Sequence, residues 1–214
     1  MISNIKNPGI IQTSDWDKVR ERFGLILDKI NDGLWEDKKI HDPLMHADVY
    51  SMDLFGGVTI SRSDDNAPWE FWNGPLFESL IPWVAAVREQ LALSGLPIGT
   101  ISYHRHTTGI SPHTDTGYFG ELPDHPHTNI NFLISSATPD ESYTWCRDDN
   151  DNEMRYYSHP NKLWILNASN IHSVVCNGFR EGLTIKFRQP YDKVDKFFKD
   201  NPDFFDVSQP YFKQ

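Results

Sequence analysis

The spacing of apolar positions changes near residue 98 of the chain. Before this point, two segments carry apolar residues three and four positions apart, which is the spacing of a helix with one buried face. These segments are residues 14–34 and residues 77–91. Pro82 lies inside the second one, and because proline fits the first turn of a helix, we expect a shorter helix that begins there. Both segments predict helices that pack against a sheet.

Beyond residue 98 the pattern is that of β-strands, with apolar residues that alternate with polar ones or form short runs. Ile130, Phe132 and Ile134 share one face of such a strand, and Asn129 and Asn131 share the other. An earlier strand is expected over residues 48–55. Seven further strands are expected over residues 98–106, 127–134, 142–147, 154–158, 162–166, 171–176 and 179–188.

Helices followed by many short strands indicate a mainly β fold with supporting helices, either a sandwich or a barrel. We expect one domain over residues 1–214, because all-β barrels often reach this length. Within it, residues 1–97 supply the helical support and the first strands, and a loop is expected over residues 62–74. Residues 98–190 form the β core, and residues 191–214 form a tail that docks on the body.

Composition narrows the range of functions. The formal net charge of -10 disfavours nucleic acid as a partner, because an acidic protein repels the phosphate backbone. We see no segment of membrane-spanning length and no secretion signal at the N-terminus. Because Cys146 and Cys176 are the only cysteines, a disulfide framework is not expected. We therefore expect a cytoplasmic protein with reduced thiols and no membrane partner.

Three residues form the main candidate for a chemical site. His113 and Asp115 lie two positions apart at the end of a predicted strand, so their side chains point the same way in extended chain. His172 lies on a later strand. Two imidazoles and one carboxylate are the ligand set that holds non-haem Fe(II) while leaving coordination positions open. We predict that these three residues bind one metal ion and form the catalytic site.

Two alternatives remain at this stage. His104 and His106 also lie two positions apart, and with His113 they could form the all-histidine site of a cupin-like, metal-dependent isomerase or hydrolase. We rank this set lower, because no nearby glutamate of the sort that a cupin site usually adds is evident. The second alternative is a non-catalytic β-barrel module whose aromatic loops bind a partner.

Residues 98–189 resemble the Fe(II)/2-oxoglutarate-dependent dioxygenases of the prolyl and aspartyl/asparaginyl hydroxylase kind. The resemblance rests on a tyrosine-bearing strand before a His-x-Asp pair, a strand after it, an apolar strand before a distal histidine, and a basic residue beyond. In order, these are Tyr103, His113 with Asp115, residues 129–134, residues 163–166 with His172, and Arg180. The resemblance implies a double-stranded β-helix, the jelly-roll or cupin-like fold, with helices against one sheet.

The same resemblance implies Fe(II) and 2-oxoglutarate as cofactors, with ascorbate as a supporting reductant. The reaction would use O2 to hydroxylate an unactivated C–H bond, with succinate and CO2 as coproducts. The substrate would be a small molecule or an amino-acid or peptide side chain. Tyr103, Asn129 and Asn131 are candidates for hydrogen bonds to 2-oxoglutarate.

In that family a basic side chain binds the distal carboxylate of 2-oxoglutarate, and arginine suits this role because its guanidinium pairs with both oxygens. Arg180, eight residues after His172, is the candidate, and Lys186 and Arg188 are alternatives. The pair Asn177-Gly178 predicts a two-residue hairpin turn, which would direct Arg180 to the face away from His172. A bulge or a loop with an odd number of residues would then be needed to bring them to the same face.

Overall fold

The computed structural model describes residues 13–33, 39–42, 47–50, 59–62, 71–73, 82–106, 109–115, 128–148, 150–157, 163–201 and 204. The statements below concern these residues. No helix among them has the length and apolar character that a membrane crossing requires.

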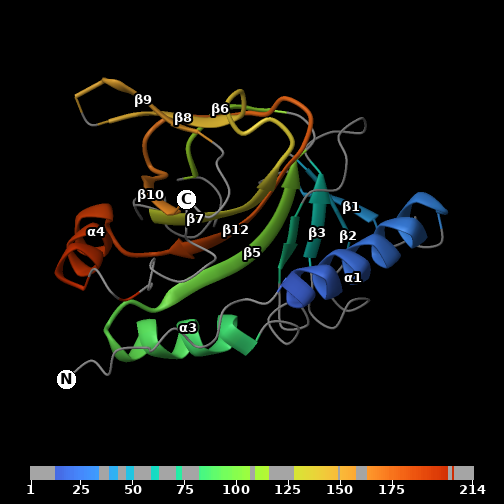
Figure 1. Ribbon diagram of the computed structural model, residues 1–214, viewed down its shortest axis with the longest axis horizontal. Helices are drawn as coiled ribbons and strands as arrows, with labels where there is room; N and C mark the ends of the chain where they lie inside the picture. Colours follow the sequence, from blue (N-terminus) through green and yellow to red (C-terminus); the bar gives the residue numbers. More distant parts are fainter. Residues whose placement is uncertain are drawn as a thin grey trace.

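The fold is built from two antiparallel sheets that face each other (Figure 1). The larger sheet contains the order β5-β12-β7-β10, and the smaller one has the order β6-β11-β8-β9. Successive strands alternate between the sheets except at the β8-β9 hairpin, which is the topology of a double-stranded β-helix. The predicted fold class is confirmed. The strands are β5 (Ile98–His106), β6 (Ile110–His113), β7 (Thr128–Ser136), β8 (Tyr143–Arg147), β9 (Glu153–Tyr157), β10 (Leu163–Asn167), β11 (His172–Val175) and β12 (Arg180–Phe187).

Four earlier strands extend the larger sheet beyond β5, in the order β1-β2-β3-β4. They are β1 (Lys39–Asp42), β2 (Ala47–Tyr50), β3 (Thr59–Arg62) and β4 (Phe71–Asn73). The sequence predicts a loop over residues 62–74, and this prediction is wrong for β4. Its three residues pair with β3 on one side and β5 on the other. Such a short strand is set by its neighbours in the sheet, so its own sequence pattern does not reveal it.

Two helices lie on the side of the larger sheet that faces away from the smaller sheet (Figure 1). α1 (Thr13–Asn31) buries Phe23, whose ring meets Tyr103 of β5 edge-on at 5.4 Å. α3 (Pro82–Leu93) begins at its proline, as the sequence pattern predicts, and buries Leu91. Each large apolar side chain buried in this way contributes about 1.5–3 kcal/mol. The helices therefore support the sheet from outside and leave its other face for the interior.

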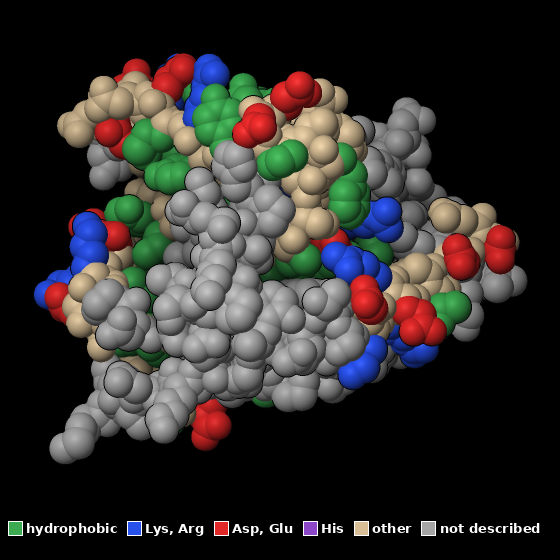
Figure 2. Space-filling view, in the orientation of Figure 1, with side chains coloured by type: hydrophobic (Ala, Val, Ile, Leu, Met, Phe, Trp, Pro, Cys, Tyr) green, Lys and Arg blue, Asp and Glu red, His purple; other side chains and the backbone are tan. Residues whose placement is uncertain are grey.

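A third helix, α4 (Tyr191–Asp200), directly follows the last strand of the core. The ring of Phe198 lies 6.4 Å from that of Phe187 in β12, so α4 also packs on the larger sheet. Its outer face carries acidic and basic side chains next to each other (Figure 2), for example Lys196 and Asp200 at 2.7 Å. Such exposed pairs contribute little to stability, and the apolar contacts hold the helix in place.

The alternation of side chains along β12 separates the two faces of the larger sheet. Glu181 contacts α1 and Phe187 contacts α4, so these residues face the helices. Arg180 contacts β8 of the smaller sheet, and Lys186 contacts Asp115 at the end of β6. The residues of β12 with even numbers thus face the space between the sheets, where the predicted metal ligands also lie.

Candidate metal centre

The pairing of β6 with β11 brings the two predicted histidine ligands together. His113 at the end of β6 lies opposite His172 at the start of β11, and Asp115 follows two residues after His113. The approach of the strands depends on Gly109, because a Cβ atom there would lie only 2.7 Å from the carbonyl oxygen of Val174. Glycine is therefore the residue that this close pairing requires.

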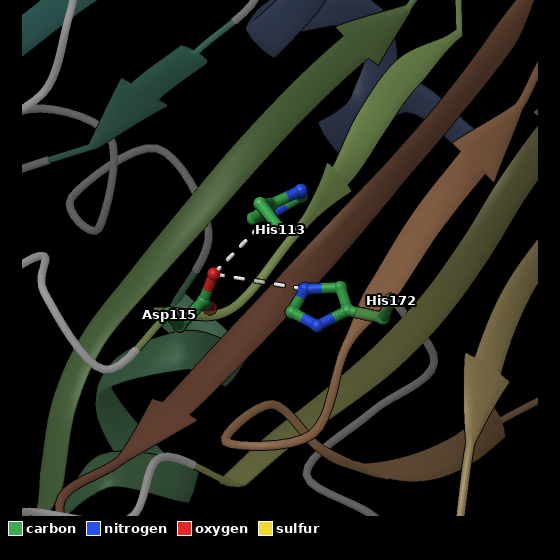
Figure 3. Close-up of side chains that lie close together, drawn as sticks. All are labelled: His113, Asp115 and His172. Atoms are coloured by element: carbon green, nitrogen blue, oxygen red, sulfur yellow. Dashed lines mark ion pairs between the residues drawn. The ribbon is translucent and has the colours of Figure 1, made fainter. Parts of the chain in front are cut away.

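The three side chains point toward one another (Figure 3). The Nε2 atoms of His113 and His172 lie 3.5 Å and 3.6 Å from Oδ1 of Asp115. One ligand atom from each residue lies within 4.8 Å of the other two. With metal–ligand bonds of about 2.1 Å, two donors on one ion lie up to about 4.2 Å apart. A small inward movement would therefore let all three residues bind one ion.

Backbone carbonyls orient both imidazole rings. Nδ1 of His113 lies 2.8 Å from the carbonyl oxygen of Ser111, and Nδ1 of His172 lies 2.9 Å from that of Asn170. A proton on each Nδ1 donates to the carbonyl and leaves the Nε2 lone pair directed at the centre. The hydrogen bond with Asp115 raises the pKa of His113, whereas burial lowers the pKa of His172.

The carboxylate of Asp115 is buried, and two side chains hold the oxygen that faces away from the histidines, Oδ2. Oδ2 accepts a hydrogen bond from Nδ2 of Asn129 at 3.0 Å and lies 3.0 Å from Nζ of Lys186. Burial alone would raise the pKa of Asp115, but the charge of Lys186 and the contacts with the histidines and Asn129 outweigh it and hold this pKa well below its usual range. The site therefore presents an ionised carboxylate.

A buried arginine lies deeper between the sheets. Nη2 of Arg180 donates to Oγ1 of Thr144 at 3.0 Å, and its guanidinium lies 5.6 Å from the ring of Trp164. Its Nε and Nη1 atoms have no hydrogen-bond partner among the described residues, and burial lowers the pKa of Arg180 to about 10. Thr144 pairs with Val174, two residues beyond His172, so the guanidinium lies roughly 7 Å along the strand from the triad.

The connection between His172 and Arg180 differs from the sequence prediction. The pair Asn177-Gly178 predicts a hairpin, but β11 pairs with β6 and β8 while β12 pairs with β5 and β7. The chain crosses between sheets here. Gly178 has a φ of 90°, but Asn177 is not among the described residues with positive φ, and a type I′ turn needs both. Because the strands lie in facing sheets, Arg180 reaches the interior without a bulge in a hairpin.

Other residues predicted to contact 2-oxoglutarate are placed differently. Tyr103 lies on the α1 side of the sheet, where its hydroxyl donates to Glu181 at 2.5 Å, and the structure does not bring it to the triad. Asn131 faces the interior and accepts a hydrogen bond from Thr184 at 2.8 Å. Asn129 lies next to the triad of His113, Asp115 and His172, and donates a hydrogen bond to Asp115. Of the alternatives to Arg180, Arg188 is exposed and Lys186 contacts Asp115.

The alternative histidine set is only partly assembled. His104 and His106 lie on the same face of β5, with ring centroids 4.8 Å apart, and both are buried. Burial, and then the positive charge of its neighbours, lowers the pKa of His104 well below its usual range. Among the described residues, however, the only cluster of three convergent ligand atoms is the one that contains Asp115. The structure does not bring His113 into a site with this pair.

No protein-family profile and no curated protein matches the sequence. Several solved structures are similar to the chain. A 2OG-Fe(II) oxygenase family oxidoreductase from Burkholderia pseudomallei is 13% identical, with a TM-score of 0.43, and the match covers 76% of this chain and 78% of that one. The non-heme alpha ketoglutarate dependent epimerase SnoN from nogalamycin biosynthesis is 12% identical, with a TM-score of 0.38 and coverage of 50% and 53%.

Oxalate decarboxylase from Bacillus subtilis is 11% identical, with a TM-score of 0.38, and the match covers 62% of this chain and 28% of that one. The chain thus spans about half of the epimerase and about a quarter of the decarboxylase. All three likenesses have TM-scores below 0.5, so they carry no argument about the function of this chain. What the described residues define is a double-stranded β-helix with a candidate metal centre between its sheets.

Proposed function

We propose that this protein is an Fe(II)- and 2-oxoglutarate-dependent oxygenase. It hydroxylates an unactivated C–H bond of a small molecule or of an amino-acid or peptide side chain. The triad supports the metal part of this proposal, because two imidazoles and one carboxylate hold non-haem Fe(II) and leave positions open for other ligands. His113 and His172 supply the imidazoles, and Asp115 supplies an ionised carboxylate.

The observation that carries the 2-oxoglutarate part is the state of Arg180. A buried charged group without partners is costly, and Arg180 keeps two N–H groups unpartnered among the described residues. A carboxylate would supply a missing acceptor, for example through a bidentate pair with Nη1 and the second N–H of Nη2. The distance of roughly 7 Å along the strand to His172 suits a short dicarboxylic acid that chelates the metal with its other end.

In this proposal the metal ligands, Arg180 and Trp164 have separate roles. When bound, the metal and the 2-oxo acid supply the oxidative chemistry with O2, and succinate and CO2 are the coproducts. His113, Asp115 and His172 hold the metal on one side. Arg180 fixes the far carboxylate of 2-oxoglutarate, and the apolar ring of Trp164 covers the guanidinium and excludes water from this end.

The proposed chemistry also bears on the cellular location, the reductant and the class of substrate. Fe(II) and reduced thiols persist in a reducing compartment, and neither Cys146 nor Cys176 forms a disulfide. A cytoplasmic location is therefore part of the proposal. Ascorbate would serve as a supporting reductant in assays. The net charge of -10 disfavours nucleic acid as the substrate. The likeness to prolyl and aspartyl/asparaginyl hydroxylases in particular stays a prediction.

The test is an anaerobic titration of the Fe(II)-loaded protein with 2-oxoglutarate. Chelation of Fe(II) by a 2-oxo acid produces a visible charge-transfer band, which we expect to grow until one equivalent is bound. Arg180→Met should weaken 2-oxoglutarate binding by about 30-fold or more, the cost of removing one partner of a buried charge pair. Arg105→Met is the matched control, because Arg105 is exposed on β5 and stacks on Phe179.

Two results would contradict the proposal. A protein that binds Fe(II) but gives no band and releases no succinate would be a metal protein without 2-oxoglutarate chemistry, as in the isomerase or hydrolase alternative. A protein that binds neither metal nor acid would favour the non-catalytic binding module.

A further inference from the structure

Lys186 lies directly against the carboxylate of the metal triad. Its Nζ atom is 3.0 Å from Oδ2 of Asp115, and the side chains are 18% and 5% exposed. Asn129 donates to the same oxygen at 3.0 Å. The other oxygen, Oδ1, lies 3.5 Å and 3.6 Å from the Nε2 atoms of His113 and His172. The two oxygens of one carboxylate therefore have different partners.

The register of the larger sheet sets this arrangement. Lys186 of β12 and Asn129 of β7 are direct cross-strand partners, and both side chains reach toward the smaller sheet. Asp115 comes from the end of β6, in the smaller sheet. One carboxylate thus joins the two sheets. Because both donors come from paired strands, their positions relative to each other are fixed by the backbone.

We propose that Lys186 and Asn129 are positioning residues that hold Oδ2 of Asp115 and present only Oδ1 to the metal. The inference rests on the proposed function for the identity of the metal, but concerns the carboxylate alone. A free carboxylate can bind a metal through one or both oxygens. Binding through both would occupy a further coordination position and would break the hydrogen bonds of Oδ2, which are strong because the carboxylate is charged.

The two donors have different roles, because only Lys186 carries a charge. In the metal-free protein, Lys186 supplies positive charge to a buried carboxylate. Once a metal is bound, the metal and the ammonium lie close to the same carboxylate and repel each other. Asn129 is neutral, so it orients the carboxylate without this repulsion. Loss of Lys186 should therefore harm the empty site most, and loss of Asn129 should harm metal binding most.

The first experiment uses Co(II) alone and measures thermal unfolding of the full chain with and without the metal. We expect Lys186→Met to unfold at a lower temperature without metal, and to show a Co(II)-induced rise about 2–4 °C larger than that of the wild type. Lys186→Arg keeps the charge and should behave as the wild type. Lys196→Met is the matched control, because Lys196 pairs with Asp200 on the exposed face of α4.

The second experiment measures Co(II) affinity by calorimetric titration, without cosubstrate or turnover. Asn129→Leu should weaken Co(II) binding about 10- to 100-fold, as loss of a partner that orients a metal ligand usually does. Asn131→Leu, on the same face of β7 but bonded to Thr184, should leave the affinity within about threefold. If either primary variant fails to fold, Lys186→Gln and Asn129→Thr replace them.

The outcomes separate this inference from the proposed function. If Lys186→Met shows the same or a smaller Co(II)-induced rise, the countercharge role of Lys186 is wrong. If Asn129→Leu binds Co(II) as tightly as the wild type, the orienting role of Asn129 is wrong. In both cases His113→Ala would still lose Co(II) if the metal centre is real. If His113→Ala also retains Co(II), the centre itself fails, and the proposed function fails with it.

Discussion

Two neighbouring charged residues of β12 are buried on opposite faces of the larger sheet, and they differ in how their polar atoms are satisfied. Glu181 is 1% exposed and Arg180 is 2% exposed, so burial does not distinguish them. Arg180 donates one hydrogen bond, to Thr144, and two of its nitrogens have no partner among the described residues. The Glu181 carboxylate accepts hydrogen bonds from three described side chains: Arg20, Tyr103 and Ser135.

The pKa directions express the same contrast. Burial alone would raise the pKa of Glu181, but its hydrogen bonds, that from Arg20 first, outweigh burial and lower this pKa. Burial lowers the pKa of Arg180 to about 10, because no described acid compensates it. A complete network on the α1 side indicates a structural role. An incomplete network that faces the candidate metal ligands supports the proposed place for a charged ligand.

The largest effect on stability should come from breaking the complete network. Arg20→Met leaves the buried carboxylate of Glu181 without its charged partner. We expect a loss of about 2–3 kcal/mol in the free energy of unfolding, less than for a fully buried pair because the Arg20 side chain is 35% exposed. Urea denaturation measures it. Lys196→Met breaks an exposed pair on α4 and should cost no more than about 1 kcal/mol. Equal losses in the two variants would contradict the comparison.

The incomplete network should respond in the opposite way. Arg180→Met removes a buried charge with unpartnered nitrogens, so we expect unchanged stability or a gain of up to about 2 kcal/mol. The same variant should lose 2-oxoglutarate binding, which separates function from stability. Urea denaturation and ligand titration of one preparation test both statements. A large loss of stability would mean that Arg180 has a structural role, as Glu181 has.

A third prediction concerns the pH dependence of stability through Glu181. Its pKa in the folded protein lies below the unfolded value of about 4.3, so between the two values the unfolded chain binds more protons. The stabilisation is complete above the unfolded pKa and is lost as pH falls through the folded pKa. Denaturation curves from about pH 6 to pH 3 should show this loss, and Arg20→Met should reduce the slope. If stability falls equally steeply with pH in the wild type and in Arg20→Met, this prediction is wrong.

The smallest effect should come from Tyr103→Phe. This change removes one of the hydrogen bonds to Glu181 and keeps the ring that packs on Phe23, so we expect a loss of about 1 kcal/mol. Because Tyr103 lies on the α1 side, 2-oxoglutarate binding should not change. A clear loss of binding would support the sequence-based hypothesis that this hydroxyl contacts the acid. Denaturation and the charge-transfer titration measure the two effects.

Much of the fold follows from local patterns that need no knowledge of the partners. Alternation predicts β7, and the apolar stripe and Pro82 predict α3, because each pattern lies within one element. The β4 strand and the crossing between the sheets after β11 cannot be predicted from local patterns. Asn177-Gly178 favours a hairpin by itself, but the order of strands in both sheets overrides this preference. Strand pairing is a property of the whole chain.

The candidate site, like the fold, can be predicted from the sequence only in part. The spacing of His113 and Asp115 and the position of His172 on a later strand predict the triad that the structure brings together. The sequence does not reveal that Lys186 and Asn129 meet on Asp115, because their pairing depends on the register of β12 with β7. The alternation of side chains along β12 does indicate that Lys186 shares a face with Arg180, and this pattern can be seen in the sequence.

The crossing between the sheets has a consequence for the size of the ligand. Only residues 176–179 connect the end of β11 to the start of β12. β11 begins at His172, and β12 begins at Arg180. Both strands are held by neighbours on either side, so the connection cannot stretch without breaking paired backbone. The pairing within the two sheets therefore fixes the distance between the candidate metal ligands and the guanidinium of Arg180. An insertion of one residue there should therefore be absorbed by the connection and, under the proposed function, leave the accepted chain length of the diacid unchanged.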